Sequence, residues 1–198
     1  MDKAVIIFVR KPVLGKVKTR LAASLGNDVA LSVYKRLLQH TLEITQKVEA
    51  DKFVFYADEV DEVDMWSQEH YYKFQQHNGQ LGERMQQAFE QVFDKGYSKA
   101  CIIGSDCYEL SSSIIRDALD KLNDGAIVIG PAKDGGYYLL GMNKLYPEVF
   151  QNKNWSTSTV FSDTIKTVED LNLSYSILPT LSDIDEAEDV PEALLTSN

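Results

Sequence analysis

The sequence predicts a three-layer α/β/α sandwich built around a mostly parallel, mixed sheet. Strand-like apolar runs alternate with helix-like segments, and long loops rather than hairpin turns follow several of the runs. Residues 4–9 and 100–103 are continuously apolar, as strands covered on both faces are. At 198 residues, the chain is expected to form one domain over residues 1–198.

Composition limits the class of protein. Apolar residues make up 44% of the chain and charged residues 25%, which are ordinary values for a globular protein. The apolar runs are far shorter than the roughly 20 residues that a membrane span needs, and no export signal opens the chain, so we expect a cytoplasmic protein without a membrane span. A net charge of −10 argues against a nucleic-acid partner, because basic surface drives that binding.

Charge is unevenly distributed along the chain. Residues 3–27 contain no acid, whereas no basic residue follows Lys166 and acids crowd residues 183–192. The cations of the first segment are Lys3, Arg10, Lys11, Lys16, Lys18 and Arg20. Electrostatic screening acts over about 8 Å at physiological salt, so an anionic ligand would respond to this local cluster more than to the net charge.

The first strand is predicted at residues 4–9, which are β-branched, aromatic or alanine. A loop over residues 10–21 follows, because Pro12 and Gly15 interrupt regular structure. A cluster of one sign directly after a first strand favours a phosphate site over an ordinary solvated loop. The segment is not a Walker A motif, since Lys16 is not followed by Ser or Thr, and no G-x-G-x-x-G occurs.

The middle of the chain is predicted to continue the alternation. Asn27 and Asp28 can cap a helix that runs to about residue 48, where apolar residues recur at helical spacing. Strands follow at residues 52–57 and 71–75, and then a helix from residue 81 that ends near Gly96.

The strand at residues 100–103 leads to Asp106. The carboxyl end of a parallel strand is where open α/β sheets bind ligands, and Gly104 lets the backbone approach one. An aspartate there suits a hard divalent cation that holds phosphate oxygens, although Asp106 can equally cap the next helix or turn. Cys101 and Cys107 match no zinc spacing and are expected to be spectators.

The last third of the chain adds a second loop of interest. A helix capped within residues 111–113 is expected to run to residue 122. Strands are expected at residues 126–129, 137–141 and 174–179. A second helix is expected at residues 160–171, capped within residues 155–159. Between two of these strands, Asp134-Gly135-Gly136 reads either as a hairpin turn or as backbone that can lie against a sugar or acceptor.

Six segments in order resemble the DUF2064 family: residues 8–21, 81–85, 103–110, 130–141, 155–157 and 183–189. Members are type-A-fold (GT-A) glycosyltransferase-like proteins, similar to the molybdenum-cofactor and F420-precursor nucleotidyltransferases. The resemblance implies a nucleotide-diphospho-sugar transferase-like fold. It also implies nucleotide phosphates on the first loop and a divalent metal on the strand-end aspartate.

Position by position, the resemblance matches Lys11, Lys16 and Arg20 to the phosphate-binding loop, Asp106 to the metal-binding acid, Asp183 or Asp185 to the late acidic motif, and Asp134-Gly135-Gly136 to the acceptor-side loop. The predicted site extends these matches to neighbouring residues. The predicted nucleotide-binding residues are Lys11, Gly15, Lys16, Lys18, Arg20, Gly82 and Ser105. The predicted ligands of Mg²⁺ or Mn²⁺ are Asp106, Asp183 and Asp185, and the predicted acceptor-binding residues are Gly135, Gly136 and Trp155. The predicted catalytic residues are Asp106, Asp134 and Lys16. Two positions depart from the family pattern, with Tyr108 where Pro is usual and Glu186 where Thr is usual.

The sequence therefore predicts a metal-dependent transferase that uses an NTP or an NDP-sugar and a small-molecule acceptor. Charge building on a leaving pyrophosphate or nucleoside diphosphate can be neutralised by such a metal together with lysines. Glycosyl and nucleotidyl transfer both remain open, and so does a non-catalytic nucleotide-binding protein on the same fold.

Overall fold

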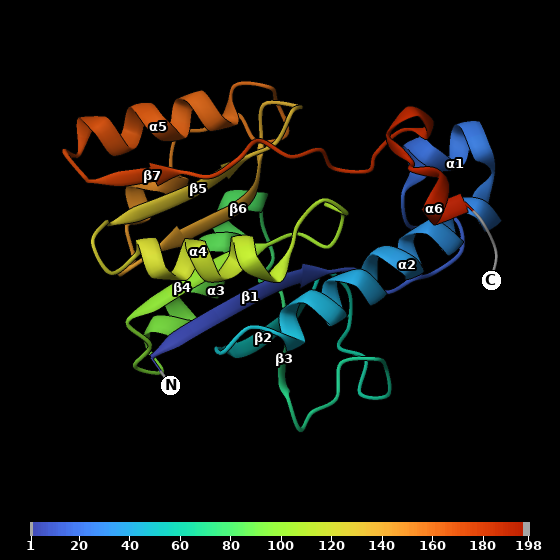
Figure 1. Cartoon of the computed structure of the whole chain (residues 1–198), viewed down its shortest axis with the longest axis horizontal. Helices are drawn as coiled ribbons and strands as arrows, with labels where there is room; N and C mark the ends of the chain where they lie inside the picture. Colours follow the sequence, from blue (N-terminus) through green and yellow to red (C-terminus); the bar gives the residue numbers. More distant parts are fainter. Residues whose placement is uncertain (1, 196–198) are drawn as a thin grey trace.

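The computed structural model describes residues 2–195 and contains one seven-stranded sheet in the order β3-β2-β1-β4-β6-β5-β7 (Figure 1). The strands are β1 (Lys3–Val9), β2 (Asp51–Tyr56), β3 (Tyr71–Gln75), β4 (Lys99–Ile103), β5 (Ile127–Pro131), β6 (Tyr137–Met142) and β7 (Tyr175–Ile177). Strand β6 runs antiparallel to β4 and β5, while the other neighbouring strands pair in parallel. The predicted mostly parallel, mixed sheet is confirmed.

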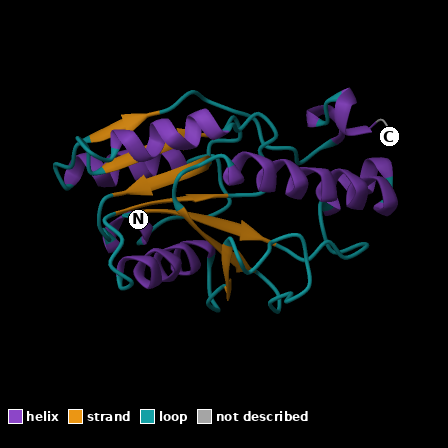
Figure 2. Cartoon of the chain, turned by 60° about the horizontal axis from the view of Figure 1, so that its bottom comes forward, coloured by secondary structure: helices purple, strands orange, loops and turns teal. Residues whose placement is uncertain are grey.

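Helices cover both faces of the sheet (Figure 2). They are α1 (Thr19–Leu25), α2 (Asn27–Gln46), α3 (Leu81–Phe93), α4 (Ser112–Lys121), α5 (Val160–Asp170) and α6 (Glu192–Leu195), with 3-10 turns η1 (Pro147–Phe150) and η2 (Ala187–Asp189). Alternate side chains of β1 point to opposite faces. Val5 and Ile7 pack in the core under α2 and α4, and Ala4 and Ile6 in the core under α3. The three predicted layers are present.

The predicted strands and long helices agree with the structure to within a few residues, but α1 was missed. The sequence predicted a loop over residues 10–21, whereas a helix begins at Thr19 and Leu21 is buried. Seven residues are too few to show helical periodicity, and the dense charge suggested a loop. Gly26, with φ of 87°, separates α1 from α2 and takes the N-cap position that was predicted for Asn27 or Asp28.

The C-terminal segment crosses the molecule. After β7 at one edge of the sheet, the chain runs back to α1 and the start of α2 (Figure 1). Ile184 and Leu194 pack there with Leu21 and Leu37 in a third, smaller core. On the way, the backbone N–H of Ile184 donates to the Asp106 carbonyl at 2.9 Å, so the late acidic segment lies beside the end of β4. None of the helices described for residues 2–195 is long and apolar enough to cross a membrane.

Candidate active site

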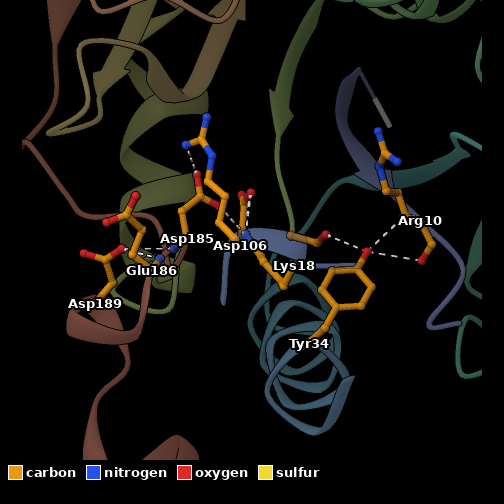
Figure 3. A network of polar contacts seen from close by, with 9 residues as sticks. Arg10, Lys18, Tyr34, Asp106, Asp185, Glu186 and Asp189 are labelled. Carbon is orange, nitrogen blue, oxygen red and sulfur yellow. Dashed lines mark hydrogen bonds and ion pairs between the residues drawn. The ribbon is translucent and has the colours of Figure 1, made fainter. Parts of the chain in front are cut away.

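Three segments that are distant in sequence meet at the carboxyl ends of β1 and β4. The Lys18 ammonium Nζ lies 2.8 Å from Asp185 Oδ1 and 3.3 Å from Asp106 Oδ2 (Figure 3). Arg20 Nη1 lies 4.0 Å from the other oxygen of Asp185. These contacts span 88 and 167 residues of sequence, and they bring the cationic loop, the strand-end acid and the late acidic segment into one site.

The two carboxylates of this site are positioned by the backbone around them. Asp106 folds back over Gly104, where an added Cβ would lie 2.6 Å from Asp106 Oδ1. The turn that carries Asp185 is closed by Asp189, whose Oδ2 accepts from the N–H groups of Asp185 and Glu186 at 3.1 and 2.8 Å (Figure 3). The acids are therefore fixed by local structure as well as by their ion pairs with Lys18.

Burial and neighbouring charges shift the pKa values of two groups of the site, Lys18 and Asp183. Burial lowers the pKa of Lys18, but the charges and hydrogen bonds of Asp106 and Asp185 outweigh burial and raise that pKa above its ordinary value. Its side chain is 8% exposed and carries a proton at neutral pH. Burial, followed by the charges of Asp106 and Asp134, raises the pKa of Asp183 to about 8. The neighbourhood of Asp183 thus carries surplus negative charge.

The same oxygens were predicted to hold a metal. Within residues 2–195, no group of three or more His, Cys, Asp or Glu is arranged as a metal site, and Asp106 and Asp185 both face the Lys18 ammonium. The chemistry of the donor set nevertheless fits a hard divalent cation. Asp183 Oδ1 is buried without a hydrogen-bond partner, and the nearby donors are carboxylate oxygens. Asp106, Asp183 and Asp185 are the residues that could hold Mg²⁺ or Mn²⁺.

The remaining cations of the first loop are open to a ligand. In the part of the chain that the structure describes, neither Lys11 nor Lys16 forms an ion pair, and Lys16 and Gly15 are exposed. The Arg20 side chain is 74% exposed. These side chains can contact an anion without first breaking a buried contact.

Tyr34 of α2 belongs to the site but was not predicted. Its hydroxyl accepts from the Arg10 N–H at 2.9 Å, donates to the Arg10 carbonyl at 3.1 Å and lies 3.4 Å from the Ser105 hydroxyl (Figure 3). It therefore ties α2 to the ends of β1 and β4, and places the predicted nucleotide-binding residue Ser105 in a buried network. A tyrosine on the mostly aliphatic buried face of a helix was the available signal, because its hydroxyl needs a partner when buried.

Arg84, in the first turns of α3, was also missed. Its Nη1 donates to Gln76 Oε1 at 2.7 Å, and Gln76 is itself fixed by donating to the Phe55 carbonyl at 3.0 Å. Arg84 Nε is buried without a partner, and burial together with the charge of nearby Arg10 lowers the pKa of Arg84. No carboxylate pairs with either arginine among residues 2–195. The two guanidinium groups, one from the first loop and one from α3, thus form a second cationic position that no carboxylate of residues 2–195 neutralises.

Gly82 and Trp155 contact each other. A Cβ added to Gly82 would lie 2.4 Å from two ring atoms of the Trp155 indole. A glycine is required at residue 82 because the indole packs directly on its backbone. This contact accounts for Gly82 by packing and joins the predicted nucleotide and acceptor sides of the site.

The predicted acceptor loop is a tight turn between β5 and β6. Asp134 Oδ1 accepts from the Gly136 N–H at 2.8 Å, which is the hydrogen bond of an Asx-turn. Gly135 has φ of 90°, and a Cβ there would lie 2.1 Å from the Ser158 carbonyl oxygen. Its own carbonyl accepts from the Phe161 N–H at 2.9 Å. The turn is therefore held against the first turn of α5 and the residues just before it.

Comparison with solved structures identifies the class of fold. A protein from Desulfovibrio desulfuricans G20, provisionally assigned as a nucleotide-diphospho-sugar transferase, is 31% identical and aligns with a TM-score of 0.85 over 93% of this chain and 83% of that one. CMP:2-keto-3-deoxy-manno-octonic acid synthetase complexed with CTP is 10% identical, with a TM-score of 0.58 over 95% of both chains. Rv0371c of Mycobacterium tuberculosis H37Rv, complexed with manganese, is 13% identical, with a TM-score of 0.55 over 98% of both. The fold is that of the nucleotide-diphospho-sugar transferases.

The family is defined by sequence. Residues 40–157 match the profile of DUF2064, described as an uncharacterized protein conserved in bacteria. This chain belongs to the DUF2064 family, as the six sequence segments predicted. No protein with a curated function matches the sequence.

Proposed function

We propose that this protein is a metal-dependent transferase that moves a group from a nucleotide-activated donor to a small acceptor. The observation that carries the proposal is the convergence of Lys18, Asp106 and Asp185 at one rim of a nucleotide-diphospho-sugar transferase fold. That rim also holds cations that form no ion pair within residues 2–195, and such cations suit the phosphates of an NTP or an NDP-sugar.

The donor would lie across the first loop. Lys16 and Arg20 are exposed there, and Arg10 and Arg84 carry uncompensated charge beside it. Guanidinium and ammonium groups favour phosphate oxygens, and these four side chains come from the loop after β1, from α1 and from α3. Together they can bind an extended polyphosphate from two sides.

A divalent cation would be held by Asp106, Asp183 and Asp185. When bound, Mg²⁺ or Mn²⁺ neutralises charge on the departing pyrophosphate or nucleoside diphosphate. The buried, unpartnered oxygen of Asp183 and its raised pKa support a cation at this position. The manganese in the Rv0371c complex shows that a protein of this fold can take such an ion.

Asp134 is the candidate to orient or deprotonate the acceptor hydroxyl. Its Oδ1 is occupied by the Gly136 N–H, while its Oδ2 makes no hydrogen bond within residues 2–195. In nucleotidyl transfer the acceptor oxygen bonds to the α-phosphorus and pyrophosphate leaves; in glycosyl transfer it bonds to the anomeric carbon and a nucleoside diphosphate leaves. In either reaction Asp134 would accept the hydroxyl proton.

The test is a panel of NTPs and NDP-sugars with Mn²⁺ and small hydroxyl, phosphate and carboxylate acceptors. Released pyrophosphate identifies nucleotidyl transfer, and a released nucleoside diphosphate identifies glycosyl transfer. Product that disappears in Asp106→Asn but persists in Asp120→Asn supports the proposal, because Asp120 pairs with Lys3 away from the rim. Nucleotide binding by thermal shift without any product would instead favour a non-catalytic nucleotide-binding protein.

A further inference from the structure

Lys18 differs from every other cation in the first loop. Its ammonium lies between two carboxylates, at 2.8 and 3.3 Å, and its side chain is 8% exposed (Figure 3). By contrast, Arg20 is 74% exposed and touches Asp185 only at 4.0 Å. Lys18 therefore supplies the positive charge that an Asp106–Asp185 pair requires in the absence of another cation.

The backbone of Lys18 is held in an unfavourable conformation. Its φ of 46° and ψ of 49° are left-handed, which non-glycine residues adopt at a free-energy cost. Lys18 is also the N-cap of α1, but its side chain makes no capping hydrogen bond. The same residue thus combines a left-handed backbone with two ion pairs, at 2.8 and 3.3 Å, that hold its side chain between the carboxylates.

We propose that Lys18 is an exchangeable internal counter-ion, which neutralises Asp106 and Asp185 until a donor polyphosphate offers its ammonium another anion. The inference rests on the proposed function and deepens it. Lys18 would leave the carboxylates free for a divalent cation only when it can itself pair with phosphate.

The charges around Lys18 predict that the affinity for a divalent cation depends on whether a donor polyphosphate is present. An ammonium in contact with both carboxylates repels a dication that approaches the same oxygens. If Lys18 moved away without a new partner, a largely buried ammonium would be left unpaired, which is strongly unfavourable. A polyphosphate removes that penalty, because its oxygens are strong acceptors for an ammonium. Free cation should therefore bind weakly, and cation with donor should bind tightly.

The alternative is that Lys18 is a fixed structural bridge that never leaves the carboxylates. If Lys18 is a fixed bridge, replacing it should make the positions of Asp106 and Asp185 less defined and weaken cation binding. An exchangeable counter-ion predicts the opposite sign, since removal of the ammonium leaves two carboxylates without a competitor. The direction of the change in cation affinity separates the two.

The experiment is a titration with Mn²⁺ alone, followed by electron paramagnetic resonance of the free ion. Wild type is compared with Lys18→Gln and with Lys133→Gln, which removes the same charge from an exposed position beside Asp134. We expect Lys18→Gln to bind Mn²⁺ at least about tenfold more tightly than wild type, and Lys133→Gln to match wild type. Unchanged or weaker binding by a folded Lys18→Gln overturns the proposal.

A measurement on the unmodified protein covers the case in which Lys18→Gln does not fold. The ¹⁵N resonance of the Lys18 ammonium should stay in place with Mg²⁺ alone and shift with Mg²⁺ plus pyrophosphate. No shift with saturating Mg²⁺ and pyrophosphate overturns the exchange. Neither experiment needs turnover, so a failed search for substrates and a failed counter-ion proposal are distinguishable.

Discussion

The two sides of the candidate site are held together by different kinds of contact. On the donor side, Lys18, Asp106 and Asp185 join through side-chain ion pairs between segments 88 and 167 residues apart. On the acceptor side, the turn at Asp134 and Gly135 is fixed by backbone hydrogen bonds and close packing. Ion pairs can exchange one partner for another while the fold persists. Backbone hydrogen bonds and close packing cannot change without changing the turn itself. The contacts on the proposed donor side can thus rearrange when a ligand binds, whereas the turn on the proposed acceptor side keeps its conformation.

The largest expected effect is on the donor side. Asp106→Asn removes the charge of one of the two carboxylates that face Lys18. Under the proposed function, it would also remove much of the stabilisation of the leaving phosphate. We expect turnover with the donor identified by the panel to fall about 1000-fold, with a thermal midpoint near that of wild type. Asp120→Asn breaks an exposed ion pair at a different place and should keep full turnover. An Asp106→Asn protein with more than a tenth of wild-type turnover would remove Asp106 from the chemistry.

On the proposed acceptor side, the expected effect of a substitution in the turn is on the free energy of unfolding. Gly135→Ala combines positive φ with a Cβ 2.1 Å from the Ser158 carbonyl oxygen. Gly96→Ala is a matched control, because Gly96 has φ of 91° but nothing within 4 Å of an added Cβ. We expect urea unfolding to show a loss of about 3 kcal/mol for Gly135→Ala and about 1 kcal/mol for Gly96→Ala. Equal losses would mean that the contact with Ser158 adds nothing to the rigidity of the turn.

A substitution at Asp134 can separate its hydrogen bond in the turn from its proposed role in proton transfer. Asn at this position keeps an oxygen that can accept from the Gly136 N–H, but it cannot accept a proton from an acceptor hydroxyl. We therefore expect Asp134→Asn to unfold within about 0.5 kcal/mol of wild type and to turn over about 100-fold more slowly. Asp134→Ala should lose both stability and turnover. Full turnover in Asp134→Asn would leave this carboxylate with the turn as its whole role.

Much of the architecture could be predicted, because it depends on local patterns. The continuous apolar runs of β1 and β4 require burial on both faces, and Ser111 does cap α4 by accepting from the Ile114 N–H at 3.4 Å. The particular partners in the site could not be predicted in the same way. Whether Lys18 meets Asp106, Asp185 or solvent depends on how the C-terminal segment crosses the molecule. That crossing is held by packing in the third core and by long-range backbone hydrogen bonds such as that from Ile184 to Asp106, not by a local signal.

The smallest effect is expected at a cation that pairs with nothing. Lys16 is exposed, and it forms no ion pair among residues 2–195, so its replacement by Ala breaks no internal contact. We expect Lys16→Ala to weaken triphosphate binding about tenfold in calorimetry, with an unchanged unfolding midpoint and a shallower dependence on salt. Lys144→Ala, over the ring of Tyr146, is the control for loss of one surface charge and should leave affinity unchanged. Equal affinities for wild type and Lys16→Ala would remove Lys16 from the donor site and leave Arg10, Lys18, Arg20 and Arg84 as the candidate cationic contacts of the polyphosphate.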